Sequence, residues 1–131
     1  MPRWISEAGI RVLHGELLAE HGGLTGSTNE DMLGATLARP QQLEAYGNPA
    51  PTIFDLAAAY GFGFAKNHCF NDGNKRVALM AIYVFLDLNN YSLVADQADA
   101  VYTIEGLAAS SISEDDLSAW IESNVLELHS I

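Results

Sequence analysis

Residues 66–79, which read KNHCFNDGNKRVAL, concentrate the side chains of this chain that are suited to chemistry. The segment holds three of the six Lys and Arg residues, Lys66, Lys75 and Arg76, although 17 Asp and Glu residues give the chain a net charge of −11. It also contains His68 and Asp72, and it leads into the ten apolar residues 77–86. Cations, an imidazole and a carboxylate in so short a segment predict a local site for an anionic substrate.

The order of residues 72–76 predicts where a phosphate group binds. If Asp72 is the N-cap of a helix, residues 73–76 form its first turn. The free N–H groups and the helix dipole make that end positive, so two cations there are unfavourable unless an anion is bound. Gly73 allows close approach of a ligand, and the Asn74 amide can donate a hydrogen bond. Because Lys75 and Arg76 can neutralise phosphate oxygens, we expect the site to bind a nucleotide polyphosphate.

Asp72 and His68 complete the expected chemistry. A carboxylate beside a phosphate requires a divalent cation between them, and Mg²⁺ is typically held by one or two carboxylates, phosphate oxygens and water. Asp72 is therefore the predicted Mg²⁺ ligand. Histidine can accept a proton at neutral pH, so His68 is the predicted general base for an attacking hydroxyl. Phe70 is expected to point inward and fix the loop.

The elements that must position these residues are predicted to be helices. Hydroxyl residues followed three positions later by an acid mark helix starts near Ser27, Thr52 and Ser113, and Ser6 gives a weaker start signal. Apolar spacing then predicts six helices, at 6–21, 28–39, 52–67, 73–89, 97–109 and 114–128, with a break at 40–51 and a few extended residues at 91–93. The fourth helix is apolar on every side. We therefore expect an all-α bundle of about six helices around this central apolar helix.

Several residues are predicted to be structural. The run 60–64, in which Gly61 and Gly63 separate aromatic residues, indicates close helix packing. Cys69 is expected to be buried filler rather than a nucleophile. The remaining histidines lack the spacing of metal ligands and are expected to be structural or solvated: His14, His21 and His129.

Composition narrows the class of protein. A length of 131 residues with 49% hydrophobic residues predicts one globular domain, 1–131. The acidic surface disfavours direct nucleic-acid binding, and the ten residues 77–86 are about half of the ~20 needed to cross a bilayer. A single cysteine excludes an intramolecular disulfide, and MPRWISEAGI lacks the pattern of a signal peptide. We expect a cytoplasmic protein that does not contact a membrane.

The segment from His68 to Arg76 resembles the signature of the Fic superfamily, and most closely its death-on-curing (Doc) branch. The pattern of His, any residue, Phe, any residue, Asp or Asn, Ala or Gly, Asn, Lys and Arg is filled at every specified position. Softer likenesses extend from Leu13-His14 to Asn89-Asn90-Tyr91. The resemblance therefore spans most of the chain.

The resemblance implies an all-helical enzyme that transfers a phosphate-containing group from ATP, with Mg²⁺, to a hydroxyl of a target protein. It implies that His68 is the base, Asp72 the metal ligand, and Gly73, Asn74, Lys75 and Arg76 the phosphate binders. Lys66 stands where some Doc-type proteins have arginine and is a further candidate phosphate binder. The Doc branch implies a toxin that phosphorylates a threonine of elongation factor Tu and blocks translation. It also implies a cognate antitoxin whose C-terminal segment docks in a helix groove.

Two alternatives remain open at this point. The first alternative is adenylyl transfer. In the adenylyl-transferring branch of the superfamily, a glycine stands at the position of Lys75 and an arginine at the position of Leu79. Lys75 and Leu79 instead resemble the Doc branch and favour transfer of the γ-phosphate. A non-catalytic module that only binds an antitoxin would not need a base beside a metal ligand. The partner segment is expected to be amphipathic and partly basic, because the chain is so acidic.

Overall fold

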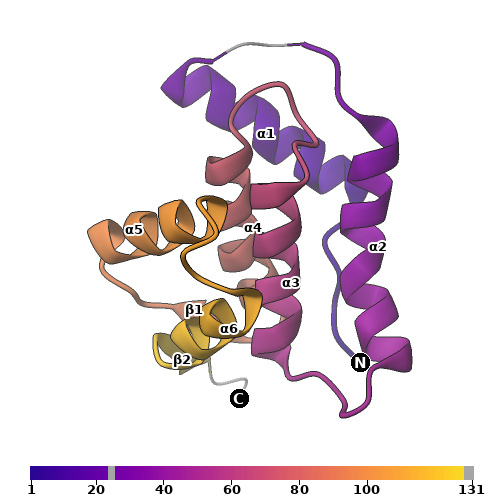
Figure 1. Ribbon diagram of the computed structural model, residues 1–131, viewed down its shortest axis with the longest axis vertical. Helices are drawn as coiled ribbons and strands as arrows, with labels where there is room; N and C mark the ends of the chain where they lie inside the picture. Colours follow the sequence, from indigo (N-terminus) through magenta and orange to yellow (C-terminus); the bar gives the residue numbers. More distant parts are fainter. Residues whose placement is uncertain (24–25, 129–131) are drawn as a thin grey trace.

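The computed structural model describes residues 1–23 and 26–128, so the expectation for His129 lies outside the described residues. Six helices and a short antiparallel strand pair make up this part of the chain (Figure 1). The elements are α1 (Glu7–His21), α2 (Glu30–Tyr46), α3 (Ile53–Lys66), α4 (Asn74–Leu88), β1 (Tyr91–Leu93), α5 (Gln97–Ala108), α6 (Glu114–Glu122) and β2 (Val125–Glu127). The prediction of an all-α fold with about six helices is confirmed.

Helices α3 and α4 lie side by side through the middle of the molecule, with α1, α2, α5 and α6 around them (Figure 1). The more enclosed of the two is α3, whereas we expected α4 to be the central helix. Leu79 and Met80 of α4 remain partly exposed. Helix α4 packs mainly against α1, α3 and α5, whereas α3 packs against α2, α4, α5 and α6. The IFDLAAAYGFGFAK sequence of α3 instead allows neighbours to approach on several sides.

Two glycines of α3 make this close packing possible, as the sequence predicted. A Cβ atom on Gly61 would lie 2.6 Å from Ile82 Cδ1 of α4. A Cβ atom on Gly63 would lie 2.7 Å from Thr36 Cγ2 of α2. These distances are shorter than ordinary van der Waals contact, so both positions require glycine for the observed spacing of the helices.

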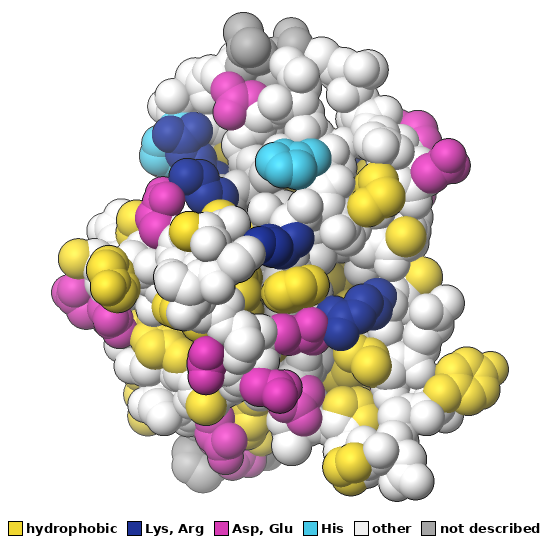
Figure 2. Space-filling model, viewed as in Figure 1, with side chains coloured by type: hydrophobic (Ala, Val, Ile, Leu, Met, Phe, Trp, Pro, Cys, Tyr) yellow, Lys and Arg dark blue, Asp and Glu magenta, His cyan; other side chains and the backbone are white. Residues whose placement is uncertain are grey.

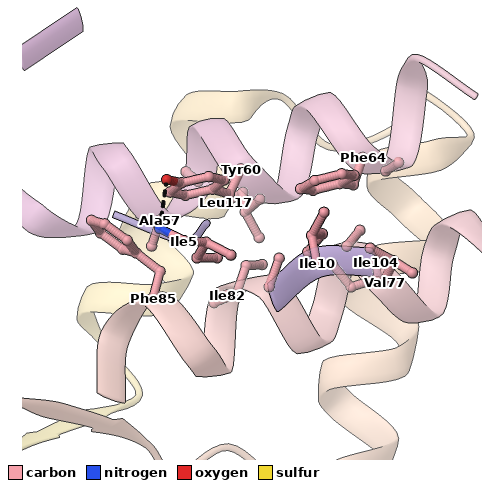
Figure 3. Close-up of a cluster of buried hydrophobic side chains, with 14 of the residues drawn as sticks. Ile5, Ile10, Ala57, Tyr60, Phe64, Val77, Ile82, Phe85, Ile104 and Leu117 are labelled. Atoms are coloured by element: carbon pink, nitrogen blue, oxygen red, sulfur yellow. Dashed lines mark hydrogen bonds between the residues drawn. The ribbon is translucent and has the colours of Figure 1, made fainter. Parts of the chain in front are cut away.

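The core gathers between α3 and α4 and includes the start of the chain. Tyr60, Phe64 and Phe85 are fully buried, and Tyr60 and Phe85 pack with their ring centroids 5.1 Å apart. The Ile5 backbone N–H donates to the Tyr60 hydroxyl at 3.2 Å (Figure 3). This bond satisfies the phenol inside the core and holds the segment before α1 against α3.

Most predicted helix starts are confirmed, and one is moved. Ser6 caps α1, and Thr52 and Ser113 form complete capping boxes with acids three residues later. At α2 the cap is Asn29, whose side chain accepts a hydrogen bond from the Met32 N–H, so the prediction of Ser27 was wrong. Asparagine and serine cap equally well, and the sequence alone did not separate them.

Two helix ends also differ from expectation. Helix α2 continues through Pro40 to Tyr46, because Pro40 is itself buried and Leu43 packs on the core beyond it. Helix α6 stops at Glu122, where Asn124 bonds back to Ile121 and Trp120. Residues 125–127 then pair with 91–93, so the predicted continuation of this helix to 128 was wrong and the extended residues at 91–93 are confirmed.

Both ends of the described chain are fastened at the C-terminal end of α4. The Asn89 side chain accepts from the Arg3 N–H at 2.8 Å and donates to the Arg3 carbonyl at 3.0 Å. The Leu128 N–H donates to the Asn90 carbonyl at 2.7 Å. Within residues 1–23 and 26–128, none of the helices combines the length and apolar character required to cross a bilayer.

Candidate active site

The loop from Asn67 to Gly73 connects α3 to α4 and carries the predicted base and metal ligand. Phe70 is buried at 4% exposure, as expected, and its backbone is held by the Asn74 side chain. The Asn74 Oδ1 accepts from the Phe70 N–H at 3.1 Å, and Nδ2 donates to the Phe70 carbonyl at 2.9 Å. The side-chain amide of Asn74 therefore orders the loop. The group of Asn74 that is available to a ligand is its backbone N–H at the start of α4.

The N-cap of α4 is Gly73 rather than Asp72, which corrects the predicted cap. Gly73 adopts a left-handed conformation with φ of 81°, which glycine tolerates without a steric penalty. Asp72 lies one residue outside the helix, and its Oδ1 accepts from the Gly73 N–H at 2.8 Å. Because glycine offers no capping side chain, the N–H groups of the first turn of α4 keep their capacity to bind an anion.

A pocket of about 740 Å³ opens at this end of α4. It brings together six of the seven predicted site residues, namely His68, Asp72, Gly73, Asn74, Lys75 and Arg76. Val101, Ile104 and Ala108 of α5 form an apolar wall of the same pocket. Its size and mixed lining suit a small polar ligand with an apolar part.

His68 stands at the edge of this pocket in an unusual backbone conformation. Its φ is 48°, a left-handed value that few non-glycine residues adopt, and its side chain is exposed. His68 also lines a second, polar hollow of about 510 Å³ together with Ser27, Thr28 and Asn71. The imidazole is therefore reachable from two sides, and strain of this kind gathers at functional sites.

Lys75 is paired with an acid of α5. Its ammonium donates to both carboxylate oxygens of Glu105 at 3.0 Å, and the two side chains are half exposed at 50% and 56%. Glu105 also lines the pocket. An exposed pair of this kind contributes at most about 1 kcal/mol, so a phosphate can compete for the lysine. The 30-residue separation gave no sequence signal for this contact.

Lys66 does not reach this pocket. Its ammonium donates to the Ala108 carbonyl at 3.3 Å and to the Ser110 hydroxyl, which ties the end of α3 to the end of α5. It lines a different groove, between α2, α3 and α6. The predicted phosphate-binding role of Lys66 is therefore not supported by its position, because its orientation is set by the carbonyl at the end of α5.

Asp72 is half-buried, and its surroundings fit a metal–phosphate complex better than a metal site made by protein alone. Among the described residues, no three His, Cys, Asp or Glu side chains gather closely enough to hold an ion. A single carboxylate next to helix N–H groups and cations is the donor set that Mg²⁺ uses when phosphate oxygens and water complete its shell. Gly23 packs so closely that a Cβ there would lie 3.0 Å from Asp72 Oδ2.

Cys69 is buried and does not line the pocket, in agreement with the prediction that it is structural. Its side chain is fully buried, and its sulfur lies 3.3 Å from the Thr36 hydroxyl. Burial raises the pKa of the Cys69 thiol, and the contact with Thr36 offsets only part of this effect. The thiol is therefore protonated at neutral pH and poorly suited to act as a nucleophile.

The comparisons with known proteins agree with this geometry. The Fic/DOC family model matches residues 4–86. The chain belongs to the Fic/DOC family. It is 32% identical over 111 residues to "Protein kinase doc" of Escherichia phage P1, a match that covers 85% of this chain and 86% of the relative. It is 42% identical over 76 residues to "Toxin Doc" of Mycolicibacterium smegmatis, covering 57% of this chain and 58% of the relative. The expected Doc branch is therefore confirmed.

Charge is distributed unevenly around this Doc-like site. Most of the Lys, Arg and His side chains visible in Figure 2 lie in the upper half of that face, together with some acids, whereas acidic side chains dominate its lower part, where α6 lies in Figure 1. Helix α6 begins with three consecutive acids, Glu114, Asp115 and Asp116. Lys75 and Arg76 line the pocket, so its lining carries two positive charges on a chain of net charge −11, which favours an anionic ligand there.

Proposed function

We propose that this chain is the toxin of a toxin–antitoxin pair and that it transfers the γ-phosphate of ATP to a hydroxyl of a target protein. The observation that carries the proposal is the single pocket in which a reachable imidazole, a carboxylate, two cations and a helix N-terminus converge. The names of the two Doc relatives, a protein kinase and a toxin, support the same reading.

In the proposed reaction the triphosphate lies at the N-terminus of α4. Backbone N–H groups of the first turn, with Lys75 and Arg76, bind its oxygens. Asp72 would hold Mg²⁺, which when bound neutralises charge on the phosphate oxygens. Phosphoryl transfer needs positioning and charge neutralisation more than covalent help from the protein, and this set of groups supplies both.

The acceptor hydroxyl is proposed to approach His68 from the polar hollow edged by Ser27 and Thr28. His68 accepts the hydroxyl proton while the hydroxyl oxygen attacks the γ-phosphorus and the bond from that phosphorus to the bridging oxygen breaks. The products are a phosphorylated side chain and ADP. The start of α2 is held against the loop that carries His68, since the Asn29 N–H donates to the Cys69 carbonyl at 2.8 Å. The proposed acceptor is a threonine of an elongation factor Tu-like protein, whose modification would block translation.

Labelled ATP distinguishes this reaction from its alternatives. With Mg²⁺ and elongation factor Tu, ATP labelled in the γ-phosphate should label the factor, and His68→Ala should lower the rate at least 100-fold because the base is lost. Label arriving only from the α-phosphate would replace the proposal with adenylyl transfer. ATP that binds without any transfer, together with tight antitoxin binding, would indicate a non-catalytic module.

The antitoxin is proposed to dock in the groove of about 660 Å³ between α2, α3 and α6. Leu43, Phe62 and Leu107 give this groove apolar lining, and Asp55 and Asp115 stand among the acids beside it. This combination suits the amphipathic, partly basic segment expected from the net charge.

Charge reversal tests this groove. Asp115→Lys should weaken antitoxin binding several-fold in 50 mM salt and much less in 500 mM salt, because exposed charges are screened at high ionic strength. The measurement is titration calorimetry with a peptide of the antitoxin's C-terminal segment. Glu20→Lys on α1 makes the same change of charge away from the groove and serves as the control. Equal weakening by both variants would contradict the assignment.

A further inference from the structure

His14, in the middle of α1, contacts the candidate active-site loop 58 positions before Asp72. Its Nε2 lies 2.9 Å from the Asp72 carbonyl oxygen. Its ring stacks on Phe70 with centroids 3.9 Å apart and planes 13° apart. A Cβ on Gly73 would lie 3.7 Å from its Cδ2. One side chain outside the loop thus contacts two residues of it, Phe70 and Asp72, and its ring lies beside Gly73.

The hydrogen bond has a defined direction. A carbonyl oxygen can only accept, so the His14 Nε2 carries the hydrogen and donates. The sequence predicted a structural or solvated His14, and its contacts with Phe70 and Asp72 agree with a structural role. Its partner, however, is the backbone of the predicted metal ligand.

Holding the Asp72 carbonyl also holds the Asp72 carboxylate. The carbonyl of Asp72 and the N–H of Gly73 belong to one planar peptide unit and cannot turn independently. That N–H donates to Asp72 Oδ1 at 2.8 Å. His14 therefore fixes one end of a rigid plane whose other end orients the carboxylate.

The two contacts of His14 have separable roles. The ring stack continues through Phe70 to Phe64 of α3, whose centroid lies 6.4 Å from that of Phe70, and so contributes to packing between α1 and the core. The Nε2 hydrogen bond reaches only the Asp72 peptide. Replacing the ring and replacing the donor should therefore change different properties of the protein.

We propose that His14 is a positioning residue that orients Asp72 for the Mg²⁺–ATP complex, an inference that rests on the function proposed above. His14 does not touch the reacting atoms. It acts by fixing the peptide plane from which the carboxylate is directed into the pocket, and its loss should raise the Mg²⁺ concentration needed for nucleotide binding.

Two complementary variants test this proposal. His14→Phe keeps a flat ring and removes the donor, whereas His14→Gln keeps an N–H donor at similar reach and removes the ring. For each full-length variant we would measure the melting temperature and, by titration calorimetry, the Mg²⁺ concentration that gives half-maximal ATP binding. His14→Phe should raise that concentration roughly ten-fold with little change in melting temperature, as the loss of one hydrogen bond of ~1.4 kcal/mol implies.

His14→Gln should show the opposite combination, with a lower melting temperature and a Mg²⁺ requirement within about two-fold of the wild type, since the donor is restored. A Mg²⁺ requirement that follows the melting temperature across both variants would overturn the positioning role and leave only a structural one. Unchanged Mg²⁺ dependence in His14→Phe would overturn it as well.

The failure of the positioning proposal can be told apart from the failure of the proposed kinase. The calorimetric readout reports ATP and Mg²⁺ binding without any transfer. Wild-type protein that binds Mg²⁺–ATP but never labels a target would contradict the kinase proposal. The Mg²⁺ concentrations required by the two His14 variants would still test the positioning role. Wild-type protein whose ATP binding does not depend on Mg²⁺ overturns the role of His14 directly, because Asp72 would then hold no metal.

Discussion

At the scale of single residues, the site depends on charges that are already partly neutralised in the protein alone. Lys75 binds Glu105 through both carboxylate oxygens, and Asp72 accepts the N–H of Gly73. Ligand binding therefore exchanges one partner for another. The energy gained from each phosphate contact is the difference between the two partners, which is smaller than the contact considered alone.

This exchange predicts the effect of Glu105→Gln. The substitution keeps the size of the side chain and removes the charge that holds Lys75, so the affinity for ATP should rise about three- to ten-fold. The melting temperature should change little, because an exposed ion pair contributes at most about 1 kcal/mol. Calorimetry with Mg²⁺–ATP measures the first quantity and thermal denaturation the second.

Glu114→Gln provides a matched control, since Glu114 pairs with Arg39 at 2.9 Å away from the pocket. That variant should bind ATP like the wild type. An unchanged affinity in Glu105→Gln would mean that Lys75 does not take part in nucleotide binding.

At the scale of elements, the packing of α4 against α3 positions the pocket, because α4 carries the proposed anion site at its N-terminus. Gly61 sets the separation between α3 and α4, with a Cβ position only 2.6 Å from Ile82 Cδ1 and 3.1 Å from Leu117 Cδ2. Both neighbours are fully buried and have little room to move.

Gly61→Ala should therefore lower the free energy of unfolding by about 1–3 kcal/mol, because one extra methyl group over-packs a closed interface. Gly15→Ala in α1 is the matched control, since nothing lies within 4 Å of its Cβ position. It should instead raise the free energy of unfolding by about 0.5–1 kcal/mol through helix propensity. Urea denaturation of both variants checks the pair, and a stabilising Gly61→Ala would show that α4 can move away freely.

How far the sequence predicted the elements depended on whether a local signal existed. The helix starts at Thr52 and Ser113 were predicted because a capping box is a local pattern. The continuation of α2 through Pro40 and the change from α6 to a strand were not, because packing of Leu43 and pairing of Val125 with Leu93 decide them. In the site, the segment from His68 to Arg76 was recognisable as one motif. Contacts from α1 and α5, made by His14 and Glu105, depend on tertiary structure and left no trace in spacing.

At the scale of the whole molecule, α6 is attached to the α3 end remote from the pocket by a partly buried acid–hydroxyl contact. Asp55 accepts a hydrogen bond from Ser118 at 2.6 Å and from the Thr52 N–H at 2.9 Å. Burial acts to raise the pKa of Asp55, but these hydrogen bonds outweigh it and hold the pKa below its usual value of 3.8. The charged form of Asp55 is therefore the one that the fold stabilises.

Acid should lower the free energy of unfolding by protonating Asp55. Because the pKa of Asp55 is lower in the folded state, its contribution is present above pH 3.8, the usual value, and is lost as the pH falls through the lower folded value. Asp55→Asn should lower the free energy of unfolding at pH 7 and flatten its decline on acidification below about pH 4. Urea denaturation at a series of pH values measures both effects.

Ser118→Ala offers an independent check, since it removes a donor to Asp55 and keeps the acid. Ser118→Ala should partly flatten the decline of the free energy of unfolding at low pH. Parallel pH curves for the wild type and both variants would contradict the assignment of this acid sensitivity to Asp55.

The anchoring of residues 3 and 128 to Asn89 and Asn90 has a practical consequence for handling the protein. These anchor points lie at the opposite end of the 15-residue helix α4 from the pocket, about 22 Å away at 1.5 Å per residue. A surface tether or fluorescent reporter joined before residue 3 or after residue 128 should thus be attached at the end of α4 remote from the proposed nucleotide site. The pocket of the immobilised protein should then face the solution, so single-molecule or surface-based binding assays can use either end of the chain.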